Sequence, residues 1–259
     1  MYKRQASILA YEQLKEHLAP HGYTPVPYTP GLWRHSTRRT TFTLAVDDFG
    51  IKHFSRNDAE HLFSALREKY IITVDWTGSH YLGFTLHWNY TEGWVDLSMP
   101  DYVPNALARL GHTKPKVPQH APHLWTSPVY GQKVQLANDD ITPLLDKLGI
   151  KRVQQISGIF LYYGRAVDQT IIVALNEISN SQARPTEKTA KACTMLLNYL
   201  ATHPDAIVRF YASDMILCIV SDAAYLVLPN ARSRASGLFF LTDHTSTAPH
   251  TPHPHSPLH

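Results

Sequence analysis

The spacing of apolar and polar residues predicts a mixture of helices and strands in the first half of the chain. Residues 5–18 and 58–69 carry apolar side chains at helical spacing, with charged residues between them, which predicts two amphipathic helices. Phe42–Val46 is a short apolar run typical of a buried strand, and a second apolar stretch follows closely, so we expect a hairpin there. The same patterns predict four further elements, which are strands at 71–74, 81–88 and 94–99 and a helix at 101–110. This order of elements indicates an α+β fold.

The second half of the chain begins with a break in periodicity. Residues 112–135 are rich in proline and histidine, which predicts a linker or a long surface loop. Helices are expected at Arg165–Ile178 and Pro185–Thr202, because apolar residues recur there at helical spacing. Met215–Val220 and Gly237–Leu241 are apolar runs and predict two strands.

The composition is that of a folded globular protein. The 259 residues are 44% hydrophobic and 17% charged, which argues against an intrinsically disordered chain, and the net charge of +3 permits a nucleic-acid partner without requiring one. Cys193 and Cys218 lie in apolar periodic stretches, so we expect reduced core cysteines and an intracellular protein, cytoplasmic or nuclear. We expect no membrane association, because no run approaches the roughly 18 apolar residues of a membrane span.

Asp47 and Asp48 are the strongest candidates for chemistry, since they lie at the tip of the predicted hairpin. Two adjacent acids repel each other and are costly to desolvate, and a divalent cation offsets both costs. Mg²⁺ is usually held by one or two carboxylates together with substrate phosphates, as in metal-dependent phosphoryl or nucleotidyl transfer. The alternative is an ordinary Asp-Asp turn with solvated carboxylates.

Two further groups of residues can be interpreted either as functional sites or as ordinary surface structure. Arg34, Arg38 and Arg39 precede the acidic hairpin, where they could contact phosphates or simply form a solvated loop. Asp222 follows the strand that is expected to end at Val220, so it could be a metal ligand or the cap of a turn.

The acidic hairpin and an ordered set of downstream motifs resemble the polymerases of copia-type LTR retrotransposons. Phe42–Lys52 resembles the catalytic hairpin of reverse transcriptases, in which an aromatic residue and any one residue precede Asp-Asp. Asp75–Gly83 is similar to the acidic turn before Leu-Gly at the primer-grip hairpin, and Val95–Leu107 to the strand and helix that follow. Later segments resemble the connection region and the opening of the RNase H domain, namely Arg165–Thr170, Pro185–Thr202 and Ser221–Gly237. The resemblance covers most of residues 20–242.

The resemblance implies a particular α+β organisation. It is the C-terminal half of a reverse-transcriptase palm with thumb or connection helices, followed by the start of an RNase H-like α/β domain. We therefore expect a partial palm with the following hairpin and helix at 1–111, a Pro/His-rich linker at 112–135, connection helices at 136–208, the start of the RNase H-like domain at 209–242 and a disordered Pro/His-rich tail at 243–259.

The activity implied by the resemblance is that of an RNA-directed DNA polymerase. Asp47 and Asp48 would bind Mg²⁺ or Mn²⁺ for two-metal nucleotidyl transfer, with the ions about 3.5–4 Å apart. Leu82 and Gly83 would press on the primer backbone, and Asp222 would be the first of several RNase H metal ligands. The implied partners are an RNA template, a DNA primer, a dNTP and the remainder of a longer polyprotein.

The sequence also departs from the family pattern. Ala45 replaces the usual Tyr or Phe, which removes an aromatic contact at the primer terminus. Another catalytic Asp is expected before Met1 and further RNase H acids beyond His259, so we expect little or no polymerase or RNase H activity from these residues alone. Two other classes stay open. One is a non-catalytic nucleic-acid-binding remnant of a transposable element, and the other is a magnesium-dependent phosphohydrolase in which His53 and Asp75 join the acidic pair.

Overall fold

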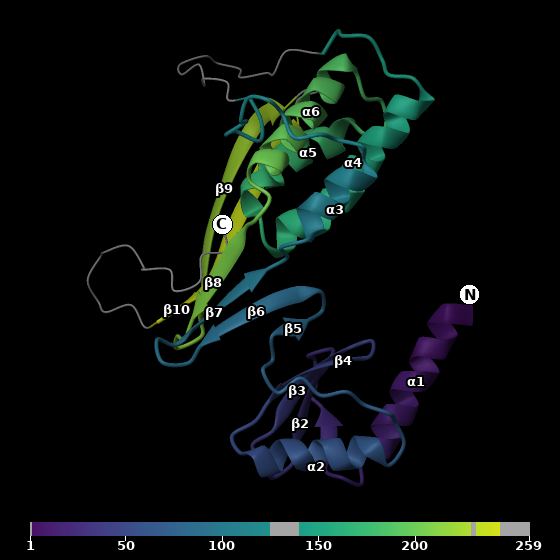
Figure 1. The fold of residues 1–259 in the computed structure, drawn as a ribbon, viewed down its shortest axis with the longest axis vertical. Coiled ribbons are helices and arrows are strands. Elements are labelled where there is room, and N and C mark those ends of the chain that lie inside the picture. The colour runs from purple at the N-terminus through teal and green to yellow at the C-terminus, as the bar shows by residue number, and fades with distance from the viewer. Residues whose placement is uncertain (1, 125–139, 229–231, 244–259) are drawn as a thin grey trace. The chain divides into compact units, whose positions relative to one another are not determined.

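Two compact units make up the structure, which is a computed structural model (Figure 1). The structure describes residues 2–124, 140–228 and 232–243. The first unit comprises residues 1–86 and the second residues 87–259. The chain passes from one unit to the other within strand β6, Phe84–Asn89.

The first unit packs two helices and an antiparallel sheet around one core. Its main elements are α1 (Tyr2–Leu18), β1 (Tyr23–Pro25), β2 (Leu32–His35), β3 (Thr41–Ala45), β4 (Asp48–Lys52) and α2 (Arg56–Arg67). The four strands pair in sequence order. Leu18 of α1, Trp33 and Phe42 of the sheet and Leu62 and Leu66 of α2 are buried in a single hydrophobic cluster. The aromatic centre of this cluster is Trp33 stacked on Phe42, with ring centroids 5.5 Å apart.

Helix α2 forms where its apolar pattern predicts, and its start is fixed by a side-chain cap. Ser55 is the N-cap residue, and its hydroxyl accepts a hydrogen bond from the backbone N–H of Asp58. Leu62, Phe63 and Leu66 are buried on one face of the helix. The predicted helix at 58–69 is thus confirmed, with both boundaries two residues earlier than expected.

Two short stretches of the first unit differ from the sequence prediction. Residues 23–40 read as an extended connection, yet they contain β1 and β2, which extend the sheet beyond β3. The strand predicted at 71–74 is wrong, because these residues have no regular structure. Ile71 is exposed there and Ile72 packs on the core, so Ile72 alone anchors this connection to the unit.

Strand β5 (His80–Tyr81) and the first half of β6 form a second hairpin in the first unit. Leu82 and Gly83 are its two loop residues, with φ of 51° and 82°. Positive φ at both loop positions is the signature of a type I′ turn. The strand predicted as continuous over 81–88 is therefore broken by this turn, and the strand proper begins at Phe84.

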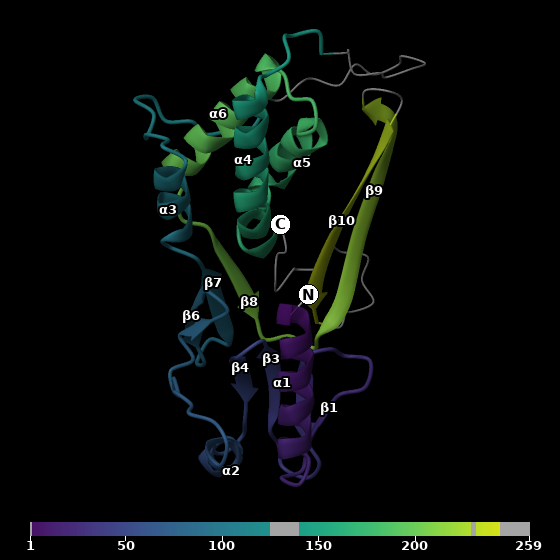
Figure 2. The same cartoon turned by 90° about the vertical axis from the view of Figure 1, so that its right-hand side faces the viewer.

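The second unit contains a helical layer. Its helices are α3 (Tyr102–Arg109), α4 (Lys147–Ala166), the 3₁₀ turn η1 (Gln169–Ile171), α5 (Ile172–Ser181) and α6 (Glu187–Thr202). Phe160 of α4, Leu175 of α5 and Leu196 of α6 are buried where these helices pack together (Figure 2). Tyr102 of α3 stacks on Tyr163 of α4 and donates a hydrogen bond to the carbonyl of Ile159, 2.6 Å away.

The helix predictions for this unit are partly confirmed. Helices α3 and α6 lie where the apolar spacing predicts them. The start of the helix predicted at Arg165–Ile178 is wrong. Arg165 and Ala166 are the last residues of α4, and Val167 is the C-cap residue at which that helix ends. Asp168 then caps η1 by accepting a hydrogen bond from the backbone N–H of Thr170. The linker expected at 112–135 is irregular over residues 112–124, and its remainder lies outside the described residues.

Strands β7 (Trp94–Ser98) and β8 (Ile207–Tyr211) pair antiparallel in the second unit. Asp96 and Arg209 lie opposite each other in this pair and form a two-point ion pair, with N–O distances of 2.7 and 2.8 Å. The Arg209 guanidinium also lies over the ring of Trp94, 3.8 Å from its centroid. The predicted strand at 94–99 is confirmed.

The last two described strands, β9 (Ile216–Leu228) and β10 (Arg232–Thr242), form a long antiparallel ribbon. Figure 2 shows the two strands running side by side over most of their length. Both strands are longer than predicted, and β9 does not end at Val220. Ile219 and Val220 point to opposite faces because successive strand residues alternate, and they are 55% and 54% exposed.

The architecture is compatible with the expected α+β class, since the described residues combine helices with antiparallel sheets. The described part of the chain contains no helix whose length and apolar content would let it cross a bilayer.

Candidate functional site

The predicted acidic hairpin is present, with its two acids at the tip. Strands β3 and β4 pair up to Ala45 and Asp48, which leaves Val46 and Asp47 as a two-residue loop. Both aspartates are exposed. Val46 has a φ of 59°, a left-handed conformation that costs about 1–2 kcal/mol for a residue with a side chain. The tip thus presents two carboxylates to solvent from a tight, strained turn.

The base of this hairpin is packed closely against the second hairpin of the same unit. The Thr43 hydroxyl lies 2.7 Å from the Tyr81 hydroxyl, so a hydrogen bond joins β3 to β5. Gly50 of β4 lies beneath this bond, and a Cβ there would come within 2.7 Å of Thr43 Oγ1 and 3.0 Å of the Tyr81 ring. Glycine is therefore needed at this position for the two hairpins to approach.

The second hairpin carries the residues that the resemblance assigns to the primer backbone. Leu82 and Gly83 form its turn, and the Leu82 side chain is 37% exposed. The structure thus brings the Asp47–Asp48 pair and the Leu82–Gly83 turn into one unit, on hairpins joined by the Thr43–Tyr81 hydrogen bond.

The donor set at the acidic tip is two carboxylates. In the part of the chain that the structure describes, one group of three or more His, Cys, Asp or Glu side chains has ligand atoms close enough to share an ion, and neither Asp47 nor Asp48 belongs to it. Two carboxylates fit Mg²⁺ when substrate phosphates and water complete the octahedral shell. They are too few to form a closed protein cage for the ion.

The three arginines near the hairpin are exposed, but their surroundings differ. Arg34 lies on β2 next to the buried Trp33, and strand alternation turns its side chain outward. Arg38 donates a hydrogen bond to Asp58, 3.2 Å away, and the Arg39 guanidinium lies 3.6 Å from the centroid of the Phe54 ring. Arg34 is consequently the best placed of the three to bind a phosphate, because Arg38 would first have to leave Asp58 and Arg39 would have to leave Phe54.

Asp222 lies in the middle of a strand, which corrects the expectation of a strand end. It pairs with Ser236 across the ribbon, and its carboxylate accepts a hydrogen bond from the Ala223 N–H. Its side chain is exposed. The sequence also predicts a basic polar turn at 230–234, which falls partly on residues 229–231, outside the described residues.

Asp75 and His53, the additional ligands of the phosphohydrolase interpretation, have structural partners instead. Asp75 accepts hydrogen bonds from the backbone and the hydroxyl groups of Thr77 and Ser79. These bonds, first that from the Thr77 hydroxyl, hold the pKa of Asp75 well below its usual range. His53 contacts the Ser55 carbonyl and the edge of Trp76. Asp75 therefore organises the turn into β5.

A group that the sequence prediction did not single out is formed by His17, His21 and Glu68. Their ligand atoms all lie within 4.8 Å of one another. The sequence contains little signal for it, because His17 lies in the predicted helix at 5–18 whereas His21 lies beyond its end, after Pro20. Glu68 could not be paired with them from the sequence, since 47 residues separate it from His21.

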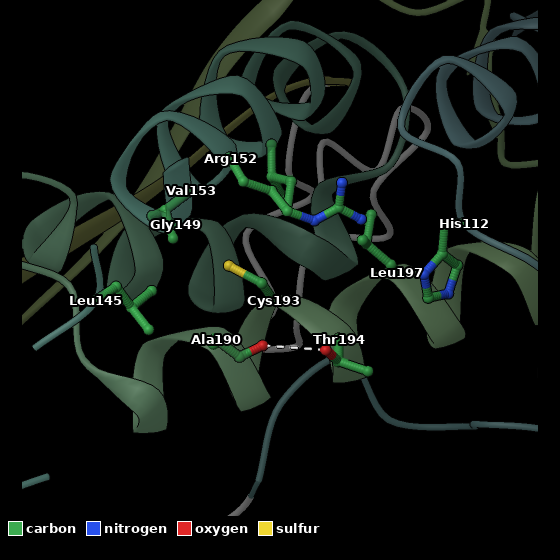
Figure 3. A pocket seen from close by; sticks show the side chains of 10 residues that line it. His112, Leu145, Gly149, Arg152, Val153, Ala190, Cys193, Thr194 and Leu197 are labelled. Carbon is green, nitrogen blue, oxygen red and sulfur yellow. Dashed lines mark hydrogen bonds between the residues drawn. The ribbon is translucent and has the colours of Figure 1, made fainter. Parts of the chain in front are cut away.

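A small pocket in the second unit lies between α4 and α6 (Figure 3). Its volume is about 180 Å³, and Arg152, Val153, Cys193 and Leu197 are among its lining residues. Burial raises the pKa of the Cys193 thiol to about 11, so the cysteine is an inert core residue at neutral pH. The pocket is smaller than the roughly 300–1,000 Å³ of typical ligand sites and holds none of the acids discussed above.

Comparison of the chain with protein-family models, with curated proteins and with solved structures finds no match.

Proposed function

We propose that the chain is part of an RNA-directed DNA polymerase of the copia-type retrotransposon class, acting by metal-dependent nucleotidyl transfer on an RNA template, a DNA primer and a dNTP. The observation that carries this proposal is the pair of hairpins joined by the Thr43–Tyr81 hydrogen bond. One hairpin ends in two exposed carboxylates and the other in the Leu82–Gly83 turn.

The acidic hairpin supplies the ligands for this chemistry. Asp47 and Asp48 would hold Mg²⁺ or Mn²⁺, which when bound supplies Lewis acidity for attack of a primer hydroxyl on a phosphate. The two-residue loop keeps both carboxylates at the tip, where a triphosphate can approach from solvent. Phe42 of β3 stacks on Trp33 of β2, and this contact ties the acidic hairpin to the buried core of the unit.

The neighbouring groups would position nucleic acid. Arg34 would contact a phosphate of the template or primer, with Arg38 and Arg39 following once they release Asp58 and Phe54. The Leu82–Gly83 turn would press on the primer backbone. Such contacts fix the register of the strand and do not read its sequence.

The β9–β10 ribbon supports the proposal that an RNase H-like domain begins here. Ile219 and Val220 place exposed apolar side chains on opposite faces of this antiparallel ribbon, which leaves both faces for further elements of such a domain to cover. Asp222 would be one metal ligand of that domain, which needs further acids to cleave RNA.

The alternative function is nucleic-acid binding without catalysis. Ala45, in place of an aromatic side chain, favours it, because the hairpin then lacks a surface on which the primer terminus could rest. Under this alternative the arginines bind and the two aspartates are solvated.

The experiment that tests the proposal measures metal and nucleic-acid binding together. Mn²⁺ binding is followed by electron paramagnetic resonance, and binding of a fluorescent RNA–DNA template–primer by anisotropy, with and without Mg²⁺. The chain is compared with the Asp47→Asn/Asp48→Asn variant and with Asp101→Asn, a matched control at an exposed aspartate that makes no side-chain cap bond.

We expect Mn²⁺ binding and a Mg²⁺-dependent gain in template–primer affinity that the double variant loses and the control keeps. Metal-independent binding that survives Asp47→Asn/Asp48→Asn would refute the catalytic proposal and support the binding remnant. Absence of nucleic-acid binding altogether would refute both.

A further inference from the structure

The end of helix α1 and the end of helix α2 bring two imidazoles and a carboxylate together. His17 lies in the last turn of α1, and His21 follows one turn later in the turn that leaves the helix. Glu68 is the C-cap residue of α2. The Nε2 atom of His21 lies 3.1 Å from Oε2 of Glu68, and the ligand atoms of all three residues lie within 4.8 Å of one another.

The group is backed by the core of the first unit. Leu18 and Leu66, next to His17 and near Glu68 in the chain, are 0% and 3% exposed and belong to the same hydrophobic cluster. The His17 ring is held by a hydrogen bond of 2.7 Å between Nε2 and the Ala65 carbonyl, and by an edge contact with the Tyr70 ring. The two helix ends are therefore fixed relative to each other before any ion binds.

The nitrogen and oxygen ligands of these three side chains favour a divalent metal ion of intermediate softness, such as Zn²⁺. Imidazole nitrogen and carboxylate oxygen are ligands of Zn²⁺, and a set of two histidines and one glutamate leaves a fourth position for water. Mg²⁺ prefers oxygen ligands, so this group differs in selectivity from the Asp47–Asp48 tip. Ligand atoms around tetrahedral Zn²⁺ lie about 3.4 Å apart, a spacing that follows from Zn–N and Zn–O bonds of about 2.1 Å. The His21–Glu68 pair is already near this spacing, and the exposed Glu68 side chain can move to complete it.

We propose that His17, His21 and Glu68 form a Zn²⁺ site that clips the end of α1 to the end of α2. The site is independent of the polymerase proposal, because it uses none of the same residues. Glu68 is distant in sequence from the two histidines, so all three ligands meet only in the folded unit, which binds the ion more tightly than the unfolded chain does. At a free Zn²⁺ concentration 100 times its dissociation constant, the unfolding equilibrium constant is expected to fall about 100-fold.

The test must separate this group from the other histidines of the chain. The background for all measurements is the full chain with the histidines of the C-terminal segment changed to serine, namely His244, His250, His253, His255 and His259. Zn²⁺ binding is measured by calorimetry, and Co²⁺ is used as a spectroscopic probe of coordination geometry.

Three variants and two controls are compared. His21→Ala and Glu68→Gln remove ligands from half-buried and exposed positions, and His17→Ala removes the third ligand. His53→Ala is a control at an exposed histidine, and His120→Ala disrupts the His120–His203 pair, whose ring nitrogens lie 3.1 Å apart. Circular dichroism verifies that each variant is folded. If His17→Ala unfolds, the other two variants still decide the outcome.

We expect one equivalent of Zn²⁺, a tetrahedral Co²⁺ spectrum, and at least tenfold weaker binding in His21→Ala and Glu68→Gln with both controls unchanged. Equal Zn²⁺ affinity in His21→Ala and in the background chain would overturn the proposal, as would loss of binding in His120→Ala alone. Absence of Zn²⁺ binding by the background chain would overturn the proposal and leave the His21–Glu68 contact as an ordinary hydrogen bond.

Discussion

Phe42 supports the acidic hairpin from below, and its truncation tests whether the core of the first unit is packed as described. The side chain is 1% exposed. Its ring lies 5.5 Å from Trp33, 5.2 Å from Phe49 and 6.0 Å from Tyr23, measured between centroids. Phe42→Ala removes all three ring contacts and leaves a void between the sheet and α2.

The expected loss of unfolding free energy follows from this environment. Truncation of a fully buried phenylalanine costs about 3–5 kcal/mol, which combines the lost transfer free energy with the cavity left behind. Phe42→Leu fills most of the void and loses mainly the aromatic pairing, which amounts to about 0.5–1.5 kcal/mol for each favourable ring pair. We expect the leucine variant to lose about 1–2 kcal/mol of unfolding free energy. Most of this loss comes from the Phe42–Trp33 ring pair, because these two rings are the most nearly parallel of the three pairs. Thr24→Ala is the matched control, because Thr24 is an exposed residue of the same sheet, and it should change stability by less than about 0.5 kcal/mol.

The assay is guanidinium unfolding followed by tryptophan emission, with hydrogen exchange read by mass spectrometry to assign the transition to residues 1–86. Trp33 is fully buried against Phe42, so it contributes to the emission change when this core is lost, and hydrogen exchange separates that change from the signals of the other four tryptophans. The packing of Phe42 would be refuted if the unfolding free energy of Phe42→Ala lay within about 1 kcal/mol of the parent value. It would also be refuted if the β3 and β4 amides of this variant exchanged at the parental rate.

Three smaller perturbations test other parts of the structure. Val46→Asn should raise the unfolding free energy by about 1 kcal/mol, because asparagine tolerates the positive φ of this exposed turn position better than valine does; unchanged or lower stability in chemical denaturation would contradict the turn geometry. Thr186→Ala should lower stability by about 0.5–2 kcal/mol by removing the N-cap of α6, and Thr186→Ser should restore most of it in the same assay. At pH 8 a thiol reagent should label Cys218 in the native chain and reach Cys193 only on unfolding, because burial raises the pKa of Cys193 to about 11; rapid native labelling of both thiols would show that the α4–α6 interface opens.

The sequence predicted best the elements whose pattern is local and strongly periodic. Helix α2 has apolar residues on one face and a serine cap, and β3 is a short apolar run that ends at two acids. The boundaries of such segments can be predicted locally, because the run of buried apolar residues ends where the polar residues of the next turn begin. The Asp47–Asp48 tip was predictable for this reason, whereas the turn at Leu82 and Gly83 lies inside a segment that the apolar pattern predicted as one strand.

The missed elements depend on distant partners. Strands β1 and β2 are three and four residues long, so they have too few positions to show alternation, and they exist because β3 offers an edge to pair with. Helix α4 does carry Val153, Ile156 and Phe160 at helical spacing, but its three glycines lower the helix propensity of the segment. Packing against α5 and α6 overrides that weakness.

The candidate sites also differ in whether their residues are close together in the sequence. Asp47 and Asp48 are neighbours in sequence, so their proximity needed no tertiary information. The His17–His21–Glu68 group needed the packing of α1 on the rest of the first unit, and Asp222 was misplaced because the strand continues through an acidic residue. A strand interrupted by polar residues looks like two strands with a turn between them.

The β9–β10 ribbon has a consequence for folding specificity. Its four consecutive cross-strand pairs from Leu217–Leu241 to Val220–Leu238 join apolar residues throughout. In most sheets a slip of one residue exchanges a buried apolar face for a polar one, and this penalty fixes the register. Here a slip would leave apolar side chains opposite apolar side chains on both faces. These four pairs therefore do not fix the register by themselves, and the alignment of the two strands depends on residues outside them.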